Sequence, residues 1–423
     1  MEEAQPSMTY GELLRNANFR TIWFGQITSL LGDWFNFIAS VSLIALLTGS
    51  GVAIGGLFFV RMIAPFLMSP ISGVLADRYN RKYLLIASDL VRFVIVLGFF
   101  LVRTSEDVWL LYTLTALQLA VSNIFFNAKR AILPDVVPHR AIGIANVLAS
   151  ATWSVMLAFG AALGGLVAGT WGIYPAFAID AVTFIISALF IARVKMRVHP
   201  GPHTKSQQPI SGLQQFRDGL RYLRKHSDIM AIASHKAALY LFLTAGYEVI
   251  QVRIAETVFP IGIGGSLSLG LLYGMSGIGS GLGPIVARQI TGDRLRAIRL
   301  AILVGYGLSI LGLLVISPLN TFGMTLTGRL LHSLGTGIIW VFSTQLLLYL
   351  VPGHVRGRVF SFESALFTFS AAIVSLLVGN ILDRVPDLTA IIRWTALLST
   401  LPMLLWALWH RRGQFTSPSA QET

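Results

Sequence analysis

The sequence predicts an all-α integral membrane protein with twelve transmembrane helices in two six-helix bundles. The first observation is composition: 54% of the 423 residues are apolar and only 12% are charged, whereas a soluble domain averages about 25% charged residues. The second is the number of apolar runs, because a membrane-spanning helix needs about 20 such residues. Twelve runs, numbered here as spans 1 to 12, reach that length: 21–46, 51–74, 83–102, 108–127, 142–168, 173–192, 229–252, 263–287, 297–317, 322–351, 359–382 and 389–410.

The third observation is an internal repeat with a constant offset of 214 residues. Identical residues recur at this offset from span 2 to span 5: Pro70 and Pro284, Gly98 and Gly312, Pro138 and Pro352, Gly165 and Gly379. One offset that holds over several spans is typical of two related halves in parallel orientation. We therefore expect an N-terminal six-helix bundle at 21–192 and a C-terminal one at 229–410.

The formal net charge is +13, and the placement of the cations argues against nucleic acid as a partner. Most Lys and Arg fall in alternate loops and in the terminal segments 1–20 and 411–423. Four lie on the opposite side, in loops or near a span end: Arg103, Arg253, Arg384 and Arg393. By the positive-inside rule, this asymmetry predicts a multi-pass protein of the plasma (inner) membrane with both termini cytoplasmic. The surplus charge also favours contact with anionic membrane lipid.

The longest polar stretch, 193–228, predicts a cytoplasmic linker between the bundles. Apolar residues recur in it at helical spacing: Leu213, Phe216, Leu220 and Leu223. Cations occupy other positions of the same helix: Arg217, Arg221, Arg224 and Lys225. This pattern favours an amphipathic helix on the membrane surface, and a solvated linker helix is the alternative.

Several kinds of chemistry have no support in the sequence. The chain contains no cysteine, which removes disulfides, thiolate metal sites and cysteine nucleophiles. The glycine-rich run at 270–286 matches neither the dinucleotide-binding spacing G-x-G-x-x-G nor the P-loop spacing G-x-x-x-x-G-K-S/T. The sequence also contains no zinc-protease motif and no nucleophile-elbow motif. We expect no enzyme activity, no cofactor and no bound metal.

The loop between spans 2 and 3 carries a family resemblance. The stretch "GVLADRYNRK" at 73–82 resembles the signature G-x-L-A-D-R-x-G-R-K of the major facilitator superfamily. The matching residues are Gly73, Leu75, Ala76, Asp77, Arg78, Arg81 and Lys82. Asn80 stands at the usual glycine, and Asn tolerates the left-handed turn conformation that glycine favours. Other stretches, "DLVRFVI" and "RGRVFS" among them, are similar to the bacterial drug and siderophore exporter branch, which includes macrolide-efflux and enterobactin-exporter relatives.

This resemblance implies a fold of two pseudo-symmetric bundles and a cytoplasmic gate. Asp77 is expected to face the N-terminus of span 11, near Phe360 to Glu363, where a carboxylate gains from free N–H groups and the helix dipole. The residues assigned to the gate are Gly73, Asp77, Arg78, Arg81, Lys82 and Glu363. The alternative is that this loop serves only as a positive-inside anchor.

Ionisable residues at bilayer depth are candidate coupling groups, because a charge at a helix centre costs about 2.5–3.5 kcal/mol on insertion scales. Asp33 in span 1 is the first candidate proton carrier. Glu248 in span 7 is the second, and the two acids lie one residue from the repeat offset. Six more residues are assigned to the same cavity: Arg61, Arg92, Asp180, Lys236, Arg329 and His332.

These residues also have structural interpretations. Asp33 in a permanent ion pair with Arg61 or Arg92 would fix helix packing without binding a proton. His332, one turn from Arg329, is alternatively a packing residue. Glycines in span 5 predict close helix approach: Gly160, Gly164 and Gly165. Their stretch resembles the antiporter motif G-P-x-x-G-G, although Ala161 stands in place of the proline.

The function that these features favour is secondary active transport: proton-coupled efflux of small amphipathic, drug-like organic compounds by alternating access. The partners are then the organic substrate, protons and membrane lipid, and we expect a monomer. Three alternatives stay open. They are a siderophore or organic-anion exporter, a lysophospholipid or lipid flippase, and a membrane scaffold that transports nothing.

Overall fold

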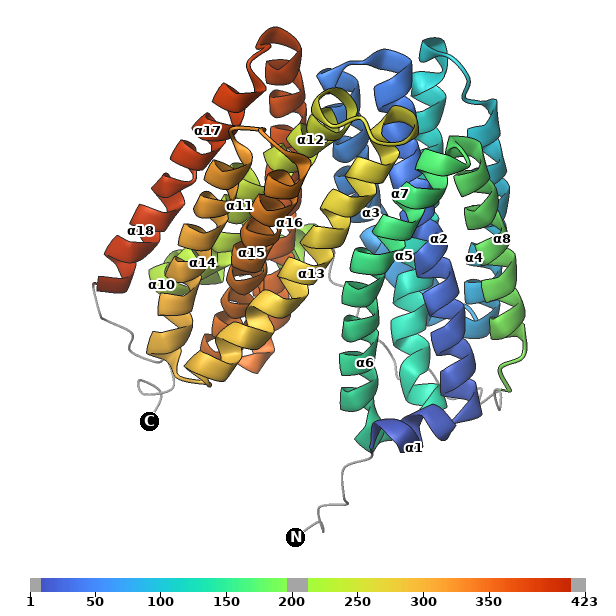
Figure 1. Ribbon diagram of the computed structural model, residues 1–423. Coiled ribbons are helices and arrows are strands. Elements are labelled where there is room, and N and C mark those ends of the chain that lie inside the picture. Colours follow the sequence, from blue (N-terminus) through green and yellow to red (C-terminus); the bar gives the residue numbers. More distant parts are fainter. Residues whose placement is uncertain (1–8, 196–211, 412–423) are drawn as a thin grey trace, which may run out of the picture. The chain divides into compact units, whose positions relative to one another are not determined.

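The computed structural model describes residues 9–195 and 212–411, and every regular element in these ranges is helical (Figure 1). Within the described residues, twelve helical spans are long and apolar enough to cross a membrane, which confirms the predicted fold class. The contacts divide the chain into two units. In described residues, unit 1 comprises 9–48, 64–195 and 260–270, and unit 2 comprises 49–63, 212–259 and 271–411.

The helices of unit 1 include the first, third, fourth, fifth and sixth spans. Their bounds are α1 (Tyr10–Arg15), α2 (Ala17–Thr48), α4 (Arg81–Gly98), α5 (Val108–Val136), α6 (Ile142–Val155), α7 (Ala161–Thr170) and α8 (Ile173–Ala192). The short α1 has a capping box in which Thr9 and Glu12 bond reciprocally. Hydrogen bonds from Thr9 hold the pKa of the Glu12 carboxyl below its ordinary value. Leu13 of α1 is fully buried in an apolar cluster with Phe19, Leu85 and Ile132.

The helices of unit 2 include the seventh, ninth, tenth, eleventh and twelfth spans. Their bounds are α9 (Gly212–Lys225), α10 (Ser227–Ala233), α11 (His235–Leu239), α12 (Ala245–Arg253), α14 (Leu295–Ile316), α15 (Phe322–Leu350), α16 (Gly353–Arg384), α17 (Leu388–Leu398) and α18 (Thr400–Arg411). The predicted linker helix is therefore present as α9, which packs on α16. The rest of the linker at 196–211 and the terminal stretches 1–8 and 412–423 lie outside the described residues.

Two spans are shared between the units. The first part of α3 (Gly51–Arg78) belongs to unit 2 and the remainder, from Ala64, to unit 1. In α13 (Ser266–Thr291), the first residues, up to Gly270, belong to unit 1 and the remainder belongs to unit 2. The division inside α3 falls next to Pro65, which cannot donate a hydrogen bond to the preceding turn.

Three predicted spans are interrupted helices. The fifth span contains a π-helical segment at 156–160 between α6 and α7, and the seventh contains two, at 240–244 and 254–258. The twelfth breaks at Ser399, where Pro402 in the next turn cannot bond back. The hydroxyl of Ser399, beside this break, donates to the carbonyl of Phe242 in the π-helical segment of the seventh span at 3.0 Å. The Phe242 carbonyl thereby has a hydrogen-bond partner that lipid cannot supply.

Candidate functional site

A buried polar cluster in unit 1 forms where α2, α4, α5 and α8 pack together. Glycine spacing on α2 allows the close approach to α8, because a Cβ added at Gly32 would lie 2.5 Å from Asp180 Oδ1. The result is that Asp33 on α2 lies close enough to Asp180 for their charges to interact. Asp180 is completely buried and accepts a hydrogen bond from Gln118 of α5 at 3.3 Å.

Arg92 of α4 is the cation of this cluster, and only 1% of its surface is exposed. Its guanidinium contacts the Asp89 carboxylate one turn earlier on the same helix. The Asp33 carboxylate lies farther away, at 3.7 Å. The guanidinium also lies over the rings of Phe184 and Phe125, at 4.2 and 4.5 Å from their centroids, so apolar packing and charge together fix its position.

The three acids around Arg92 differ in access to solvent. Asp89 and Asp180 are fully buried, whereas the Asp33 side chain is 32% exposed. Of the two ion pairs predicted for Asp33, the one with Arg92 is present. Its N–O distance is long, at 3.7 Å, and Arg92 also pairs with Asp89. Asp33 is thus the member of the cluster best placed to exchange a proton with water.

A second buried cluster lies in unit 2 around Glu248 of α12. Arg329 of α15 donates to Glu248 at 3.1 Å and to Ser276 of α13 at 3.0 Å. Gln251 donates to the other carboxylate oxygen at 2.8 Å, and the Tyr273 hydroxyl donates to that same oxygen. The carboxylate therefore binds groups from three helices.

The other predicted site residues of unit 2 also make contacts within that unit. His332 contacts the Ser309 carbonyl at 3.2 Å, and its ring lies tilted against the Tyr247 ring with 5.1 Å between centroids, contacts typical of a packing residue. Lys236 pairs with Glu363 at 3.1 Å, and both are buried. Arg61 of α3 interacts electrostatically with Tyr273.

Arg81 and Lys82 of the signature loop bind groups within unit 1. Arg81 donates to Asp135 at 2.7 Å and to the Ala131 carbonyl at 2.9 Å, and so holds the start of α4 to the end of α5. Lys82 donates to the carbonyls of Ala192 and Val194, both at 2.8 Å, at the end of α8. The carbonyl groups that Lys82 binds are ones that the end of α8 leaves without helical partners.

Asn80 does not take the left-handed conformation that the glycine of the signature suggested. Its φ and ψ are −60° and 117°, and its side chain accepts from the backbone N–H of Lys82 as the N-cap of α4. An Asn can replace the glycine here because this position is a helix cap, where Asn is favoured.

The structure corrects one part of the predicted gate: the position of the helix N-terminus in span 11. Because α16 begins at Gly353, the N–H groups of Phe360 to Glu363 lie inside the helix and not at its N-terminus. Asp77 and Arg78 are exposed on unit 1, and Gly73 has open space at its Cβ position.

The span-5 glycines are positions of close packing. A Cβ at Gly160 would lie 2.9 Å from the Trp34 ring, and one at Gly164 would lie 3.1 Å from the Phe35 backbone. A Cβ at Gly165 would lie 2.6 Å from the Cα of Gly270. A side chain at Gly165 would push the two helices apart, and one at Gly160 or Gly164 would require Trp34 or Phe35 to shift.

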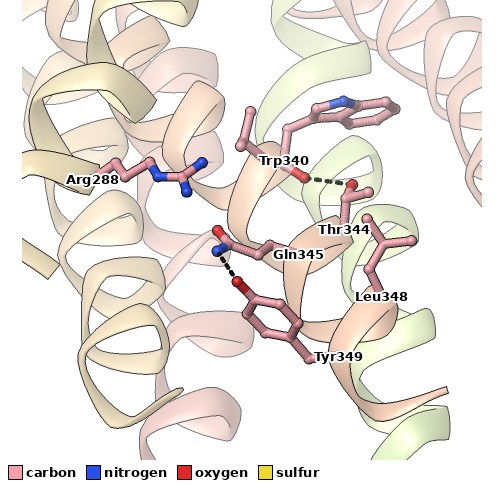
Figure 2. Close-up of a pocket in the computed structure, with 7 residues that line it drawn as sticks. Arg288, Trp340, Thr344, Gln345, Leu348 and Tyr349 are labelled. Atoms are coloured by element: carbon pink, nitrogen blue, oxygen red, sulfur yellow. Dashed lines mark hydrogen bonds between the residues drawn. The ribbon is translucent and has the colours of Figure 1, made fainter. Parts of the chain in front are cut away.

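Unit 2 also contains a cavity of about 410 Å³ between α13 and α15 (Figure 2). Its lining residues are Arg288, Trp340, Val341, Thr344, Gln345, Leu348 and Tyr349. Figure 2 shows Arg288 extending from α13 toward the side chains of α15. Asp293, in the turn after α13, accepts from Arg288, Gln345 and Tyr349, each at 3.2 Å.

Sequence reasoning missed several of these residues. Asp89 had a detectable signal, because it lies three positions before Arg92 and so on the same helix face. Tyr273, Ser276 and Gln251 had none, since uncharged polar residues are frequent in spans. Asp293 lies in a loop, and only the fold brings it to the cavity.

Twelve apolar spans in the described residues, with buried charged groups in both units, define a polytopic membrane protein. The chain belongs to the Major Facilitator Superfamily, whose family model matches residues 22–300.

Two relatives and one solved structure illustrate this membership. The uncharacterized MFS-type transporter YfiS of Bacillus subtilis (strain 168) is 27% identical over 390 residues, which are 88% of each chain. Macrolide efflux protein A of Streptococcus pyogenes is 22% identical over 399 residues, covering 90% of this chain and 93% of that one. The crystal structure of nucleoside transporter NupG superposes with a TM-score of 0.71 at 13% identity, covering 93% of this chain and 98% of that one. This last likeness shows the fold alone.

Proposed function

We propose that this protein exports small amphipathic organic compounds from the cytoplasm in exchange for protons, by alternating access. In this proposal it is a monomer in the plasma (inner) membrane with both termini cytoplasmic. Export is supported by relatives named for efflux, macrolide efflux protein A among them.

One observation carries the proton coupling: each unit holds an acid paired with a buried arginine. In unit 1 three carboxyl groups, from Asp33, Asp89 and Asp180, share the surroundings of Arg92. Like charges held together away from water strongly disfavour full ionisation, so one of the three binds a proton. Asp33 exchanges it, because its side chain is the one partly exposed.

Protonation of Asp33 changes what Arg92 can bind. With Asp33 neutral, the guanidinium keeps its contact with Asp89 and loses one charged neighbour, and the net charge of the cluster rises by one. The protonated and deprotonated clusters therefore favour different surroundings, and a bound substrate competes with the proton for one of them. Glu248 with Arg329 is the second coupling group, enclosed by more hydrogen-bond donors.

The gate assignment stays part of this proposal. Asp77 and Arg78 provide exposed charge at one end of unit 1, available for contacts that form and break during transport. Arg81 and Lys82 anchor the loop that carries them. Glu363 acts with Lys236, and this buried pair joins α11 to α16.

The test is reconstitution into proteoliposomes that enclose a pH-sensitive dye, followed by a screen of amphipathic compounds. We expect some compounds to move protons in the opposite direction, and we expect a protonophore to abolish their accumulation. Accumulation that persists with the protonophore would contradict proton coupling. Movement of fluorescent lipid between leaflets would indicate the flippase, and the absence of any flux would favour the scaffold.

A further inference from the structure

We propose that the cavity between α13 and α15 is a subsite for substrates that combine a flat apolar body with an anionic group. This inference rests on the proposed export function and assigns its substrate class. The volume of about 410 Å³ lies within the range of small-molecule sites, about 300–1,000 Å³.

The apolar wall of this subsite is held rigid by its neighbours. Trp340 packs against Phe367 at 5.4 Å and Tyr240 at 5.9 Å between ring centroids. The Lys236 ammonium lies over the indole at 4.3 Å. Val341 and Leu348 continue this wall, and fixed rings bind flat groups with little loss of side-chain entropy.

The polar wall favours an anion over a cation. Arg288 uses one guanidinium nitrogen on Asp293, which leaves further donors of its fork for a ligand carboxylate. One oxygen of Asp293 accepts from Gln345 and Tyr349 as well. An organic cation would meet the positive charge of Arg288, and the single carboxylate of Asp293 would have to balance both cations.

The experiment measures binding to purified full-length protein in lipid nanodiscs by equilibrium dialysis, with empty nanodiscs subtracted and no pH gradient. The probes share one ring system: 2-naphthoate, 2-naphthamide and 2-naphthylmethylammonium. We expect naphthoate to bind most tightly, and Arg288→Gln to weaken naphthoate alone by about tenfold or more. Trp340→Leu should weaken all three probes. Arg294→Gln, an exposed arginine outside the lining, is the matched control and should change nothing.

Two results would overturn the assignment: equal or tighter binding of the ammonium probe, or naphthoate binding that is unchanged in Arg288→Gln. Arg288→Lys, which keeps the charge and loses the fork, should give an intermediate affinity and guards against a misfolded Gln variant. Because no proton gradient is present, a negative result here leaves the proton-coupling test untouched.

A separate observation carries a second inference. We propose that Asp383 of α16 holds the start of α3 through hydrogen bonds that can break and re-form. This contact between Asp383 and residues 50–52 is called the clasp below. Its carboxylate accepts from the Gly51 N–H, from the Val52 N–H at 3.0 Å and from the Ser50 hydroxyl at 2.8 Å. A carboxylate at a helix N-terminus satisfies free donors and gains from the helix dipole.

Glycine contacts bring the two helices close enough for this clasp. A Cβ at Gly379 would lie 2.3 Å from the Gly51 carbonyl oxygen, and one at Gly55 would lie 2.3 Å from that of Ser375. Beyond the clasp, α3 passes from unit 2 to unit 1 beside Pro65. Release of Asp383 would therefore let the start of α3 follow unit 1.

The internal repeat shows that the clasp is built on one side only. Gly379 corresponds to Gly165, which makes the same kind of contact with Gly270 on the other shared span. Asp383 corresponds to Gly169, which packs against Gly262 and cannot bind as a carboxylate does. One shared span is thus held by packing alone and the other by packing plus a charge.

The clasp is tested by thiol labelling in nanodiscs, which is free of background because the chain has no cysteine. Ile54→Cys places a thiol at a fully buried position of α3, and Leu46→Cys provides an exposed reference. We expect Asp383→Ala to speed labelling at position 54 by about tenfold or more relative to the reference, with a smaller effect for Asp383→Asn.

The matched control is Asp387→Asn, which removes a carboxylate that caps the neighbouring α17. It should leave labelling at position 54 unchanged. Equal labelling rates at position 54 in Asp383→Ala, Asp383→Asn and Asp387→Asn would overturn the clasp, provided that the labelled protein elutes as a single folded species.

Discussion

The carboxylate of Asp33 lies 3.7 Å from the guanidinium of Arg92 on a neighbouring helix. A contact at that distance with one side open to solvent permits the acid to gain and lose a proton. We expect Asp33→Asn to lower substrate-driven proton movement clearly, measured with the enclosed dye, while substrate binding persists and Glu248 carries the remaining protons. Glu106→Gln, an exposed loop acid, is the control. Retention of full coupling in Asp33→Asn would remove the role assigned to Asp33.

Asp89 should act differently from Asp33, because it is the direct partner of the buried Arg92. Removing one partner of a buried pair leaves an uncompensated charge and costs about 3–5 kcal/mol. We expect Asp89→Asn to lower the thermal unfolding midpoint clearly, and Asp33→Asn to lower it little. Replacing both partners, with Asp89→Leu and Arg92→Met, should recover part of the loss. Equal midpoints for the two single variants would show that Arg92 does not depend on Asp89.

Glu248 is expected to set how many protons move with each substrate. We expect Glu248→Gln to lower the proton-to-substrate ratio without stopping transport, because Asp33 still couples. The ratio is obtained from the pH gradient that just balances a known substrate gradient. Glu256→Gln, in the same span and paired with Arg253, should leave it unchanged. If both variants give the wild-type ratio, Glu248 carries no proton.

The two repeat-related glycines should tolerate no side chain. Alanine at Gly165 or Gly379 would place a Cβ within 2.6 Å or 2.3 Å of backbone atoms on a shared span, so we expect lower unfolding midpoints and slower transport. Gly307 on α14 has open space around its Cβ position. Gly307→Ala should therefore keep or raise the midpoint, since alanine favours helix by about 1 kcal/mol over glycine. Matching effects at all three positions would count against the packing argument.

The sequence alone was sufficient for the spans and for part of the site. All twelve apolar runs are helical spans, because length and hydropathy are local properties that a bilayer selects directly. Asp33, Arg92, Asp180, Glu248 and Arg329 were all predicted as site residues, but they were assigned to one cavity and not to two clusters. Each group was detectable because a charge inside an apolar run is costly. Asp89 escaped notice, and so did the uncharged donors around Glu248.

The repeat itself could not supply the pairing of these charges. At the positions that correspond to Arg92 and Arg329, the other half has Tyr306 and Thr115. The acid of unit 1 therefore meets an arginine from the third span, and that of unit 2 meets one from the tenth.

The sequence by itself determined the class of protein, the number of spans, the repeat and which residues are costly to bury, because each depends on a run of neighbouring residues. Only the tertiary structure decided that Arg92 is shared by Asp33 and Asp89, that Glu363 binds Lys236, and that α3 and α13 are each divided between the units. The contacts of Arg92 with Asp33 and of Glu363 with Lys236 join residues far apart in the chain, and helix packing sets their distances.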